Sequence, residues 1–213
     1  MLQTKMFTVG MLQTNCYVIH CTETKEAIII DPGFTSPQEA QEIFAYINWN
    51  GLKPKLIINT HGHPDHTSGN ATIKKAYNIP IAIHEADAYM LGESGKPTAH
   101  YFGYNTVSPP ADTQLHDADT IKIGKNTLKI LHTPGHSQGS ITLTAENQAF
   151  TGDTLFAGSI GRTDFPQSSD SAMQTSLKKL TQQLPNNTTI HPGHGPTTTT
   201  NQEKQNNPFL TNP

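Results

Sequence analysis

The sequence predicts a single α/β domain over residues 1–213, and three observations support this prediction. The length of 213 residues suits one domain with a substantial hydrophobic core. Short apolar segments typical of strands alternate with segments of helical periodicity along the whole chain. No Pro-, Gly- or Ser-rich linker divides the chain into two parts.

The first elements are strands followed by a helix. Residues 6–21 predict one or two strands, with Gly10 and Thr14-Asn15 as turn residues. The apolar run at 26–30 is typical of a buried strand and ends in the turn at 31–33. A helix is expected to begin after Ser36, because Pro37 suits the first helical position and Glu39 the capping-box position. Its apolar face recurs every three or four residues until the Asn-Gly pair at 50–51.

The middle of the chain continues the alternation. Residues 56–59 predict a strand that runs into a His-rich loop at 60–66, and Thr67 or Ser68 is expected to cap a short helix ending near Tyr77. A further strand at 79–83 and a short helix at 85–91 follow. Residues 92–118 lack clear periodicity, so this segment is either a functional loop or contains elements that the pattern conceals.

The last part predicts a hairpin, two strands, a helix and a final strand. Apolar and polar residues alternate on both sides of the turn at 124–126. Strands are expected at 141–143, 148–150 and 188–190, and an amphipathic helix at 170–184. Residues 205–213 are expected to be loosely held.

Composition and charge exclude several classes of protein. The net charge is −3, and the 14 Lys and Arg residues form no basic stripe, which argues against a nucleic-acid partner. No apolar run approaches the ~20 residues of a membrane span, and the N-terminal residues do not resemble a signal peptide. Cys16 and Cys21 are too few for a disulfide framework, and their spacing in a strand places them on opposite faces. Two unlinked thiols favour a cytoplasmic enzyme.

Eleven histidines are the most informative feature of the composition. Three of them, His61, His63 and His66, stand with Asp65 in the pattern H-x-H-x-D-H directly after a predicted strand. Imidazole and carboxylate groups suit Zn²⁺, and they also suit Fe or Mn. Four donors exceed the three protein ligands of one open catalytic zinc site. The pattern therefore indicates either two metals, or one metal and an acid–base group.

Three later residues repeat the arrangement of a potential ligand next to glycine at the end of a predicted strand. His136 lies in the run T-P-G-H-S, Asp153 in T-G-D and His194 in P-G-H-G. Glycine and Pro-Gly form tight turns from which a side chain can project at the edge of a sheet. Together with the loop at 61–66, these positions predict one metal-binding constellation.

This ordered set of motifs resembles the metallo-β-lactamase-fold hydrolase superfamily over nearly the whole chain. The resemblance implies a four-layer αβ/βα sandwich that carries a pair of metal ions at one edge. By residue-for-residue match it implies that His61, His63 and His136 hold one metal, that Asp65, His66 and His194 hold the other, and that Asp153 bridges them.

Further residues narrow the resemblance to the short bacterial, glyoxalase II-like thioesterases. Asp153 stands where true β-lactamases have Cys or Ser, and the run G-S-I-G-R-T-D-F at 158–165 is similar to that branch. The runs P-G-H-G-P at 192–196 and N-P-F-L at 207–210 are also similar to that branch. The resemblance implies hydrolysis of S-2-hydroxyacylglutathione or a related small thioester by a hydroxide that the two metals hold and that Asp65 and Asp153 orient. No separate C-terminal helical domain is expected, which leaves the glutathione carrier open.

Several residues have two readings at this point. Asp31 is either a partner of a metal-bound imidazole or an ordinary turn residue. Arg162 either binds a substrate carboxylate or pairs with a neighbouring aspartate. Tyr101, Phe102 and Tyr104 either line a substrate pocket or anchor their loop to the core. His132 and His191 are interpreted as packing residues or partners of ligands, and His20, His84, His100 and His116 have no assigned role.

The alternative functions come from other classes. The first is a mononuclear-iron persulfide dioxygenase of the same fold, which shares the G-R-T-D-F run but not the complete second metal site. The second is a phosphodiesterase or tRNA-processing nuclease, which the lack of basic surface disfavours. The third is a metal-dependent binding protein without catalytic activity.

Overall fold

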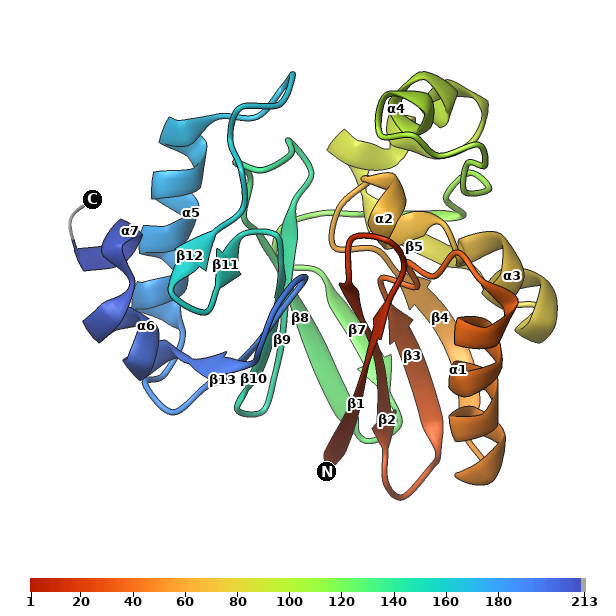
Figure 1. Ribbon diagram of the computed structural model, residues 1–213. Coiled ribbons are helices and arrows are strands. Elements are labelled where there is room, and N and C mark those ends of the chain that lie inside the picture. The colour runs from red at the N-terminus through yellow and green to blue at the C-terminus, as the bar shows by residue number, and fades with distance from the viewer. Residues whose placement is uncertain (212–213) are drawn as a thin grey trace.

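The computed structural model describes residues 1–211, in which two six-stranded sheets lie face to face with helices on their outer faces (Figure 1). The first sheet, in the order β1-β2-β3-β4-β5-β6, consists of β1 (Leu2–Val9), β2 (Thr14–Cys21), β3 (Glu26–Ile30), β4 (Lys53–Ile58), β5 (Ile81–His84) and β6 (Thr113–Leu115). The second, in the order β14-β13-β10-β9-β8-β7, consists of β7 (Thr120–Ile123), β8 (Asn126–His132), β9 (Ile141–Ala145), β10 (Gln148–Gly152), β13 (Thr189–Pro192) and β14 (Thr198–Thr199). A small hairpin joins β11 (Leu155–Phe156) to β12 (Ser159–Ile160).

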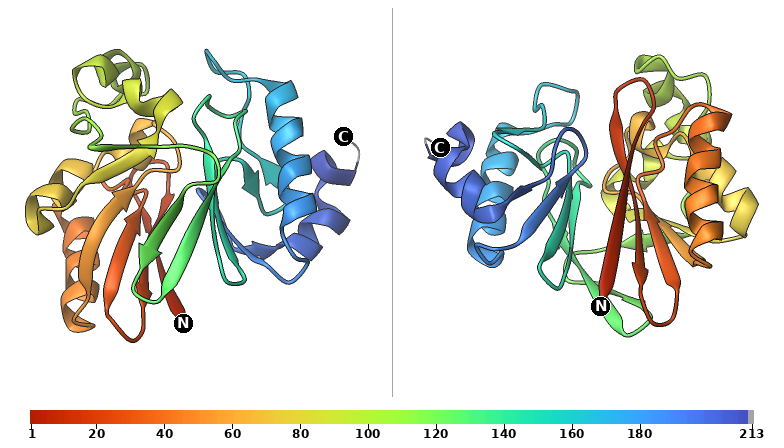
Figure 2. Two further views of the ribbon diagram at one scale, coloured as in Figure 1. Left: turned by 180° about the vertical axis from the view of Figure 1, so that it is seen from behind. Right: turned by 60° about the horizontal axis from the view of Figure 1, so that its bottom comes forward.

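The helices form the two outer layers. The first sheet is covered by α1 (Pro37–Trp49) and α3 (Asn70–Tyr77), and the second by α5 (Asp170–Gln183), α6 (Thr200–Asn206) and α7 (Pro208–Thr211) (Figure 2). Shorter helical segments near the sheet ends are α2 (Pro64–Thr67), α4 (Lys96–Tyr101), η1 (Glu85–Met90) and η2 (Glu93–Gly95). This arrangement confirms the predicted αβ/βα sandwich. None of the helices within residues 1–211 has the length and hydrophobicity that a membrane span requires.

Three hydrophobic clusters separate the four layers. One lies between the first sheet and its helices, one between the two sheets, and one between the second sheet and α5. The β3 strand shows how the alternation works, since Ile29 faces the first cluster while Ile28 and Ile30 face the second. Cys16 and Cys21 likewise face different clusters, as their spacing predicts, and both are free thiols.

Local sequence explains where α1 begins. Ser36 accepts a hydrogen bond from the Glu39 N–H, and the Glu39 carboxylate accepts one from the Ser36 N–H, so the predicted capping box is formed. The same carboxylate also accepts a 2.7 Å hydrogen bond from the Gly10 N–H. The cap of α1 therefore also holds the turn between β1 and β2, a turn that lies at 10–13 rather than at Thr14-Asn15, which begin β2.

Two other expectations were wrong, and the structure decides between the two readings of a third segment. Neither Thr67 nor Ser68 caps α3, because Gly69 precedes that helix without a side-chain cap and Ser68 donates its hydroxyl to the Phe34 carbonyl. Of the two readings of segment 92–118, that of concealed elements is confirmed, since the segment contains η2, α4 and β6. Residues 205–211 are not loosely held, because the buried Asn207 amide donates to the Phe156 and Ser159 carbonyls. Residues 212 and 213 lie outside the described range.

The start of β2 meets the loop after β13 at the edge of the sandwich. The Asn15 N–H donates a 2.7 Å hydrogen bond to the Gly193 carbonyl, and an isolated bridge pairs Thr14 with His194. The Asn15 side chain also donates to the Pro192 and Gly195 carbonyls. The start of β2 therefore holds the loop after β13 in place.

Candidate metal centre

The strand ends at one edge of the sandwich bring together every residue that the sequence motifs single out as a ligand. The loop from β4 to α2 supplies His61, His63, Asp65 and His66, and the loops after β8, β10 and β13 supply His136, Asp153 and His194. β3 and β4 run parallel, and so do β10 and β13, so their carboxyl ends meet at this edge. The seven side chains form three overlapping groups whose donor atoms lie within 4.8 Å of one another.

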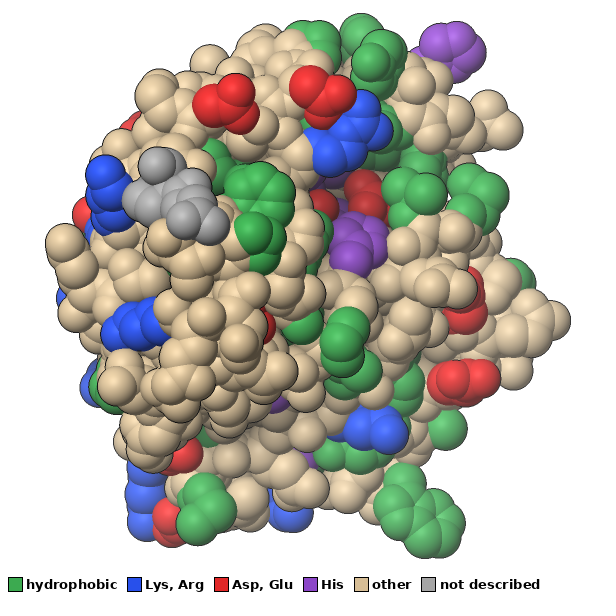
Figure 3. All heavy atoms as spheres, turned by 60° about the vertical axis from the view of Figure 1, so that its left-hand side comes forward, with side chains coloured by type: hydrophobic (Ala, Val, Ile, Leu, Met, Phe, Trp, Pro, Cys, Tyr) green, Lys and Arg blue, Asp and Glu red, His purple; other side chains and the backbone are tan. Residues whose placement is uncertain are grey.

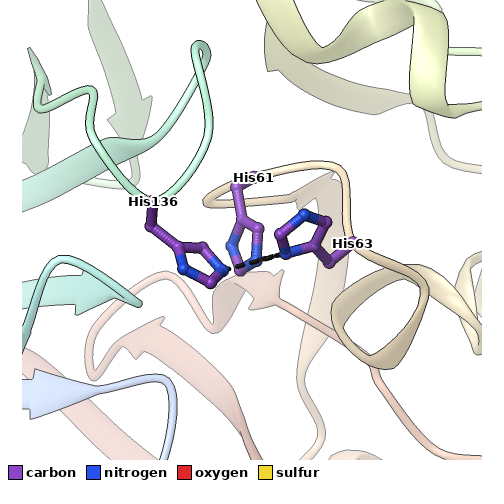
Figure 4. Close-up of side chains that lie close together, drawn as sticks. All are labelled: His61, His63 and His136. Atoms are coloured by element: carbon purple, nitrogen blue, oxygen red, sulfur yellow. Dashed lines mark hydrogen bonds between the residues drawn. The ribbon is translucent and has the colours of Figure 1, made fainter. Parts of the chain in front are cut away.

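The first group consists of three imidazoles, those of His61, His63 and His136. His63 Nδ1 lies 3.1 Å from His61 Nε2 and 2.9 Å from His136 Nε2. Figure 4 shows the three rings pointing toward one another from two loops. All three side chains are buried.

The second group consists of Asp65, His66 and His194. His194 Nε2 lies 3.3 Å from both Asp65 Oδ2 and His66 Nε2. Asp153 lies between the two groups, with Oδ1 3.4 Å from His66 Nε2 and Oδ2 3.5 Å from both His136 Nε2 and His194 Nε2. This central position suits a bridging carboxylate.

These contacts fit metal ions better than hydrogen bonds. His63 Nδ1 has two nitrogen neighbours, and one ring proton can satisfy only one of them. Asp153 Oδ1 is buried and accepts no well-formed hydrogen bond. Ligand nitrogens 2.0–2.1 Å from a tetrahedral zinc are about 3.3–3.4 Å apart, which is close to the spacing of these donor atoms. The donor set therefore fits two divalent cations.

Burial favours the neutral imidazoles of His61 and His63 in the first group. In the second group burial is outweighed by the Asp65 and Asp153 carboxylates, which raise the pKa of His66 and His194. Burial, with the neighbouring charge of His136, lowers the pKa of His63 to about 3, and burial likewise lowers the pKa of His61. Burial opposes ionisation of Asp153, but His66 and the other imidazoles outweigh it and hold the pKa of Asp153 well below its usual range. Neutral imidazole nitrogens and ionised carboxylates are the forms that bind a metal.

A second set of contacts fixes the orientation of the imidazoles. His66 Nδ1 lies 2.9 Å from Asp31 Oδ2, and Asp31 also accepts hydrogen bonds from the N–H and the hydroxyl of Thr60. Asp31 occupies the left-handed region with φ 48°, so it is both a turn residue and a partner of His66. His136 Nδ1 lies 2.8 Å from the Arg162 carbonyl oxygen, an acceptor that fixes its tautomer.

Asp87 is a functional candidate that sequence reasoning missed. Its buried carboxylate, from η1, accepts hydrogen bonds from the Gly62 N–H (3.0 Å), the Ser137 hydroxyl (2.6 Å) and the Gly139 N–H (2.6 Å). Gly62 lies between two candidate ligands of the first sheet, and Ser137 follows His136 of the second. Asp87 thus ties together the two loops that carry the first group. No sequence pattern marks it, because its partners are far away along the chain.

Gly193 allows Asp153 and His66 to pack directly against the backbone of the loop after β13. A Cβ atom at this position would lie 2.1 Å from Asp153 Oδ1 and 2.8 Å from His66 Cε1. Only a residue without a side chain fits against both groups. The Pro-Gly-His run therefore needs a glycine before His194, because Asp153 and His66 approach the backbone closely at this position.

A cavity of about 560 Å³ opens over the centre, and we call it the metal-facing cavity. Its floor includes candidate ligands, and its rim is largely apolar, with Leu12, Tyr101, Phe102, Phe156, Ile160 and Phe165. Figure 3 shows histidine and acidic side chains in a hollow on this face, with hydrophobic side chains beside them. Tyr104, by contrast, is buried and lies outside this cavity.

Arg162 lies on the rim but is engaged by a neighbour. Its guanidinium makes two hydrogen bonds with the Asp164 carboxylate, at 2.9 and 2.8 Å, and lies 4.4 Å from the centre of the Phe165 ring. The structure thus shows the ion pair, which is the second of the two readings of this residue.

The remaining described histidines lie away from the centre. His191 is buried, stacks on Phe150 and contacts Tyr17 edge-on. His132 stacks on His84 at 4.1 Å and joins the ends of β8 and β5. These contacts agree with packing roles for His132 and His191. His20 is buried against Tyr46, and His100 and His116 are exposed.

Comparison with known proteins relates this fold and centre to a large family. The model of the metallo-beta-lactamase superfamily matches residues 9–197. A relative named hydroxyacylglutathione hydrolase GloC, from Haemophilus influenzae, is 35% identical over 211 residues, which cover 97% of both chains.

Two solved structures are similar over almost the whole chain. The BLEG-1 B3 metallo-beta-lactamase is 34% identical with a TM-score of 0.89, over 98% of this chain and 100% of the other. TTHA1623 in a di-iron-bound form is 35% identical with a TM-score of 0.84, over 97% and 100%.

Proposed function

The chain belongs to the metallo-β-lactamase superfamily, and on that premise we propose that this metallo-hydrolase is a thioesterase of the glyoxalase II type. Its substrate would be S-2-hydroxyacylglutathione or a related small thioester. The observation that carries the proposal is the complete set of seven donors with a carboxylate, Asp153, between the two groups. The relative named hydroxyacylglutathione hydrolase supports it, since similarity extends over 97% of both chains.

The proposed cofactor is a pair of divalent ions, for which zinc is our first choice and iron or manganese the alternatives. The similarity to a di-iron structure keeps iron open. His61, His63 and His136 would hold one ion, Asp65, His66 and His194 the other, and Asp153 both. When bound, such a pair lowers the pKa of a shared water and polarises a carbonyl group.

Two aspartates would guide the attacking hydroxide. Asp65 and Asp153 are held ionised by the surrounding imidazoles, which lower the pKa of each. Both are acceptors for a hydroxide proton, and Thr14 orients Asp65 by donating its hydroxyl to Oδ2 at 3.3 Å. Addition of the hydroxide oxygen to the thioester carbonyl would form a carbon–oxygen bond, and collapse of the tetrahedral adduct would then break the carbon–sulfur bond and release the thiolate, a weakly basic leaving group.

Metal analysis coupled to hydrolysis of S-D-lactoylglutathione tests the proposal. We expect two metal ions per chain and turnover that a chelator abolishes and added metal restores. His136→Ala should lose metal and turnover together, whereas His100→Ala, an exposed histidine outside the centre, should lose neither. Turnover that persists in metal-free protein would refute the proposal.

Two other activities belong in the same test. A persulfide dioxygenase would contain a single iron and consume oxygen with glutathione persulfide, so the second group of donors, Asp65, His66 and His194, argues against it. β-Lactam hydrolysis has the support of the similarity to BLEG-1. Nitrocefin hydrolysis faster than that of the thioester would favour this activity over ours.

We further propose the setting in which the enzyme acts. A small thioester is its partner, and neither nucleic acid nor membrane is expected, since the 14 basic residues are scattered. The buried free thiols of Cys16 and Cys21 suit the reducing cytoplasm. Fractionation of cells would test the location.

A further inference from the structure

A second cavity lies beside the metal-facing cavity and has a volume of about 230 Å³. Its walls come mainly from η1, α4 and the loop before α5, and include Met90, Pro97, Tyr101, Phe102, Phe165 and Pro166. The imidazoles of His63 and His136 line both cavities, so the two meet at the first group of donors.

The second cavity is chemically unlike the centre beside it. Among the described residues that line it, none is acidic or basic apart from the two shared imidazoles, and most of its surface is apolar. The hydroxyl of Tyr89, another lining residue, is already engaged, because it donates to the Gln167 side chain at 2.8 Å. Such a surface favours an apolar group and disfavours a charged one.

The position of the cavity selects one part of a thioester. It reaches His63 and His136 but not Asp65, Asp153 or His194. A thioester whose carbonyl lies at the first group would therefore direct its acyl chain into this cavity. Its sulfur and carrier would extend over the second group, along the metal-facing cavity.

An aromatic pair forms the boundary on the substrate side. The rings of Phe102 and Phe165 meet edge-to-face at 5.2 Å, and both pack on His63, at 4.8 and 5.4 Å. These contacts shield the first group from solvent on this side. An acyl chain bound here would leave the carrier end in the metal-facing cavity, whose lining includes Asp65, Asp153 and Arg162 and is more polar.

The carrier end offers little charge recognition. Arg162 is the only Lys or Arg on the described lining of the two cavities, and Asp164 already neutralises it. Glutathione carries two carboxylates, and no free cation on these walls would bind them. Selectivity is therefore expected to come from the acyl chain.

We propose that the second cavity is an acyl pocket, which selects thioesters with an apolar acyl group of about six to eight carbons over the small lactoyl group. This inference rests on the proposed thioesterase function. The size follows from volume, since an apolar cavity of about 150 Å³ accommodates benzene and this one is about 230 Å³.

A series of S-acyl glutathiones from acetyl to decanoyl tests the acyl pocket with a constant carrier. Each buried CH₂ should raise kcat/KM about fourfold. We expect this rise from acetyl to hexanoyl, a plateau near octanoyl, and slower hydrolysis of the lactoyl than of the hexanoyl ester. A series that is flat or falls with chain length would overturn the inference while leaving the thioesterase proposal intact.

Two variants test whether the preference for longer acyl chains arises in this pocket. Thr98→Trp and Gln138→Trp would each fill it from a different element, so either should reduce the hexanoyl-to-acetyl ratio of kcat/KM at least tenfold. His100→Trp is the matched control, because His100 lies on the same helix but outside the pocket. A ratio that is unchanged in both pocket variants would contradict the assignment.

Binding of 1-hexanol, followed by saturation-transfer NMR, tests the pocket without catalysis. We expect binding to the wild-type protein and to His100→Trp but not to Thr98→Trp or Gln138→Trp. This outcome would support the pocket even if no thioester were hydrolysed, in which case the proposed function alone would fail. Lack of binding to the wild-type protein would refute the pocket.

Discussion

Substitution of Asp87 should weaken the fold and the metal centre together. Asp87→Ala removes the only hydrogen-bond acceptor shown for two amides, Gly62 N–H and Gly139 N–H. The Ser137 hydroxyl retains a second partner, Ser140 Oγ at 2.7 Å. A buried donor left without an acceptor costs about 1–3 kcal/mol, so we expect the free energy of unfolding to fall by about 2–6 kcal/mol. Asp87→Asn keeps one acceptor oxygen and should lose about half as much.

Urea unfolding followed by circular dichroism measures this effect, with a chelator present so that metal binding does not contribute. At about 1–3 kcal/mol per molar urea, the urea midpoint should fall by roughly 0.7 M or more. Asp112→Ala is the matched control, because Asp112 also accepts a backbone N–H, that of Ile81 at 2.8 Å, but is exposed. We expect at most about 1 kcal/mol there. Equal losses in the Asp87 and Asp112 variants would refute the reasoning.

Three further predictions concern the centre and its surroundings. Asp31→Asn replaces the acceptor for His66 Nδ1 with an amide, so metal affinity should fall about 10–100-fold in a chelator competition; unchanged affinity would contradict this role. Gly193→Ala puts a Cβ against Asp153 and should lower metal affinity at least tenfold in the same assay. Burial, with the charge of His132, lowers the pKa of His84 to about 4, so the unfolded chain takes up a proton first and stability falls as pH drops from about 6.5 to 4. His84→Asn should reduce this fall in urea midpoint, and an identical pH profile would argue against it.

The elements that sequence could predict are those whose cause is local. The capping box of α1 needs only Ser36 and Glu39, three residues apart. The buried strand β3 needs only its continuous apolar run, because neighbouring side chains point to opposite faces of the sheet. The start of α3 was missed because its cause is tertiary: a Cβ at Gly69 would lie 2.4 Å from the Pro32 carbonyl oxygen. The held position of Asn207 likewise depends on carbonyls of the distant hairpin β11–β12.

The residues of the candidate site also fall into those that local sequence predicts and those that depend on tertiary packing. The spacing of His61, His63 and His66 in one loop indicates a metal site by itself, whereas the convergence of His136 and His194 on that loop depends on how the sheets pack. Asp87 could not be found, since its three partners become neighbours only in the folded chain. The proposed acyl pocket was anticipated only in part: one reading of Tyr101 and Phe102 places them in a substrate pocket, and they do line this cavity, but the short helical segments that form its other walls lack sequence periodicity.

The pairing of Thr14 with His194 has a consequence for how the protein is made. At about 5–20 residues per second, roughly 7 to 27 seconds of translation separate His61 from His194. Throughout that interval the nascent chain carries the H-x-H-x-D-H loop without His194, which completes the second donor group, and during its first part also without His136, which completes the first. A full complement of metal can be acquired only after the last strands emerge and close onto the first hairpin. A chain that carries its full complement of metal has therefore been synthesised and folded at least as far as His194.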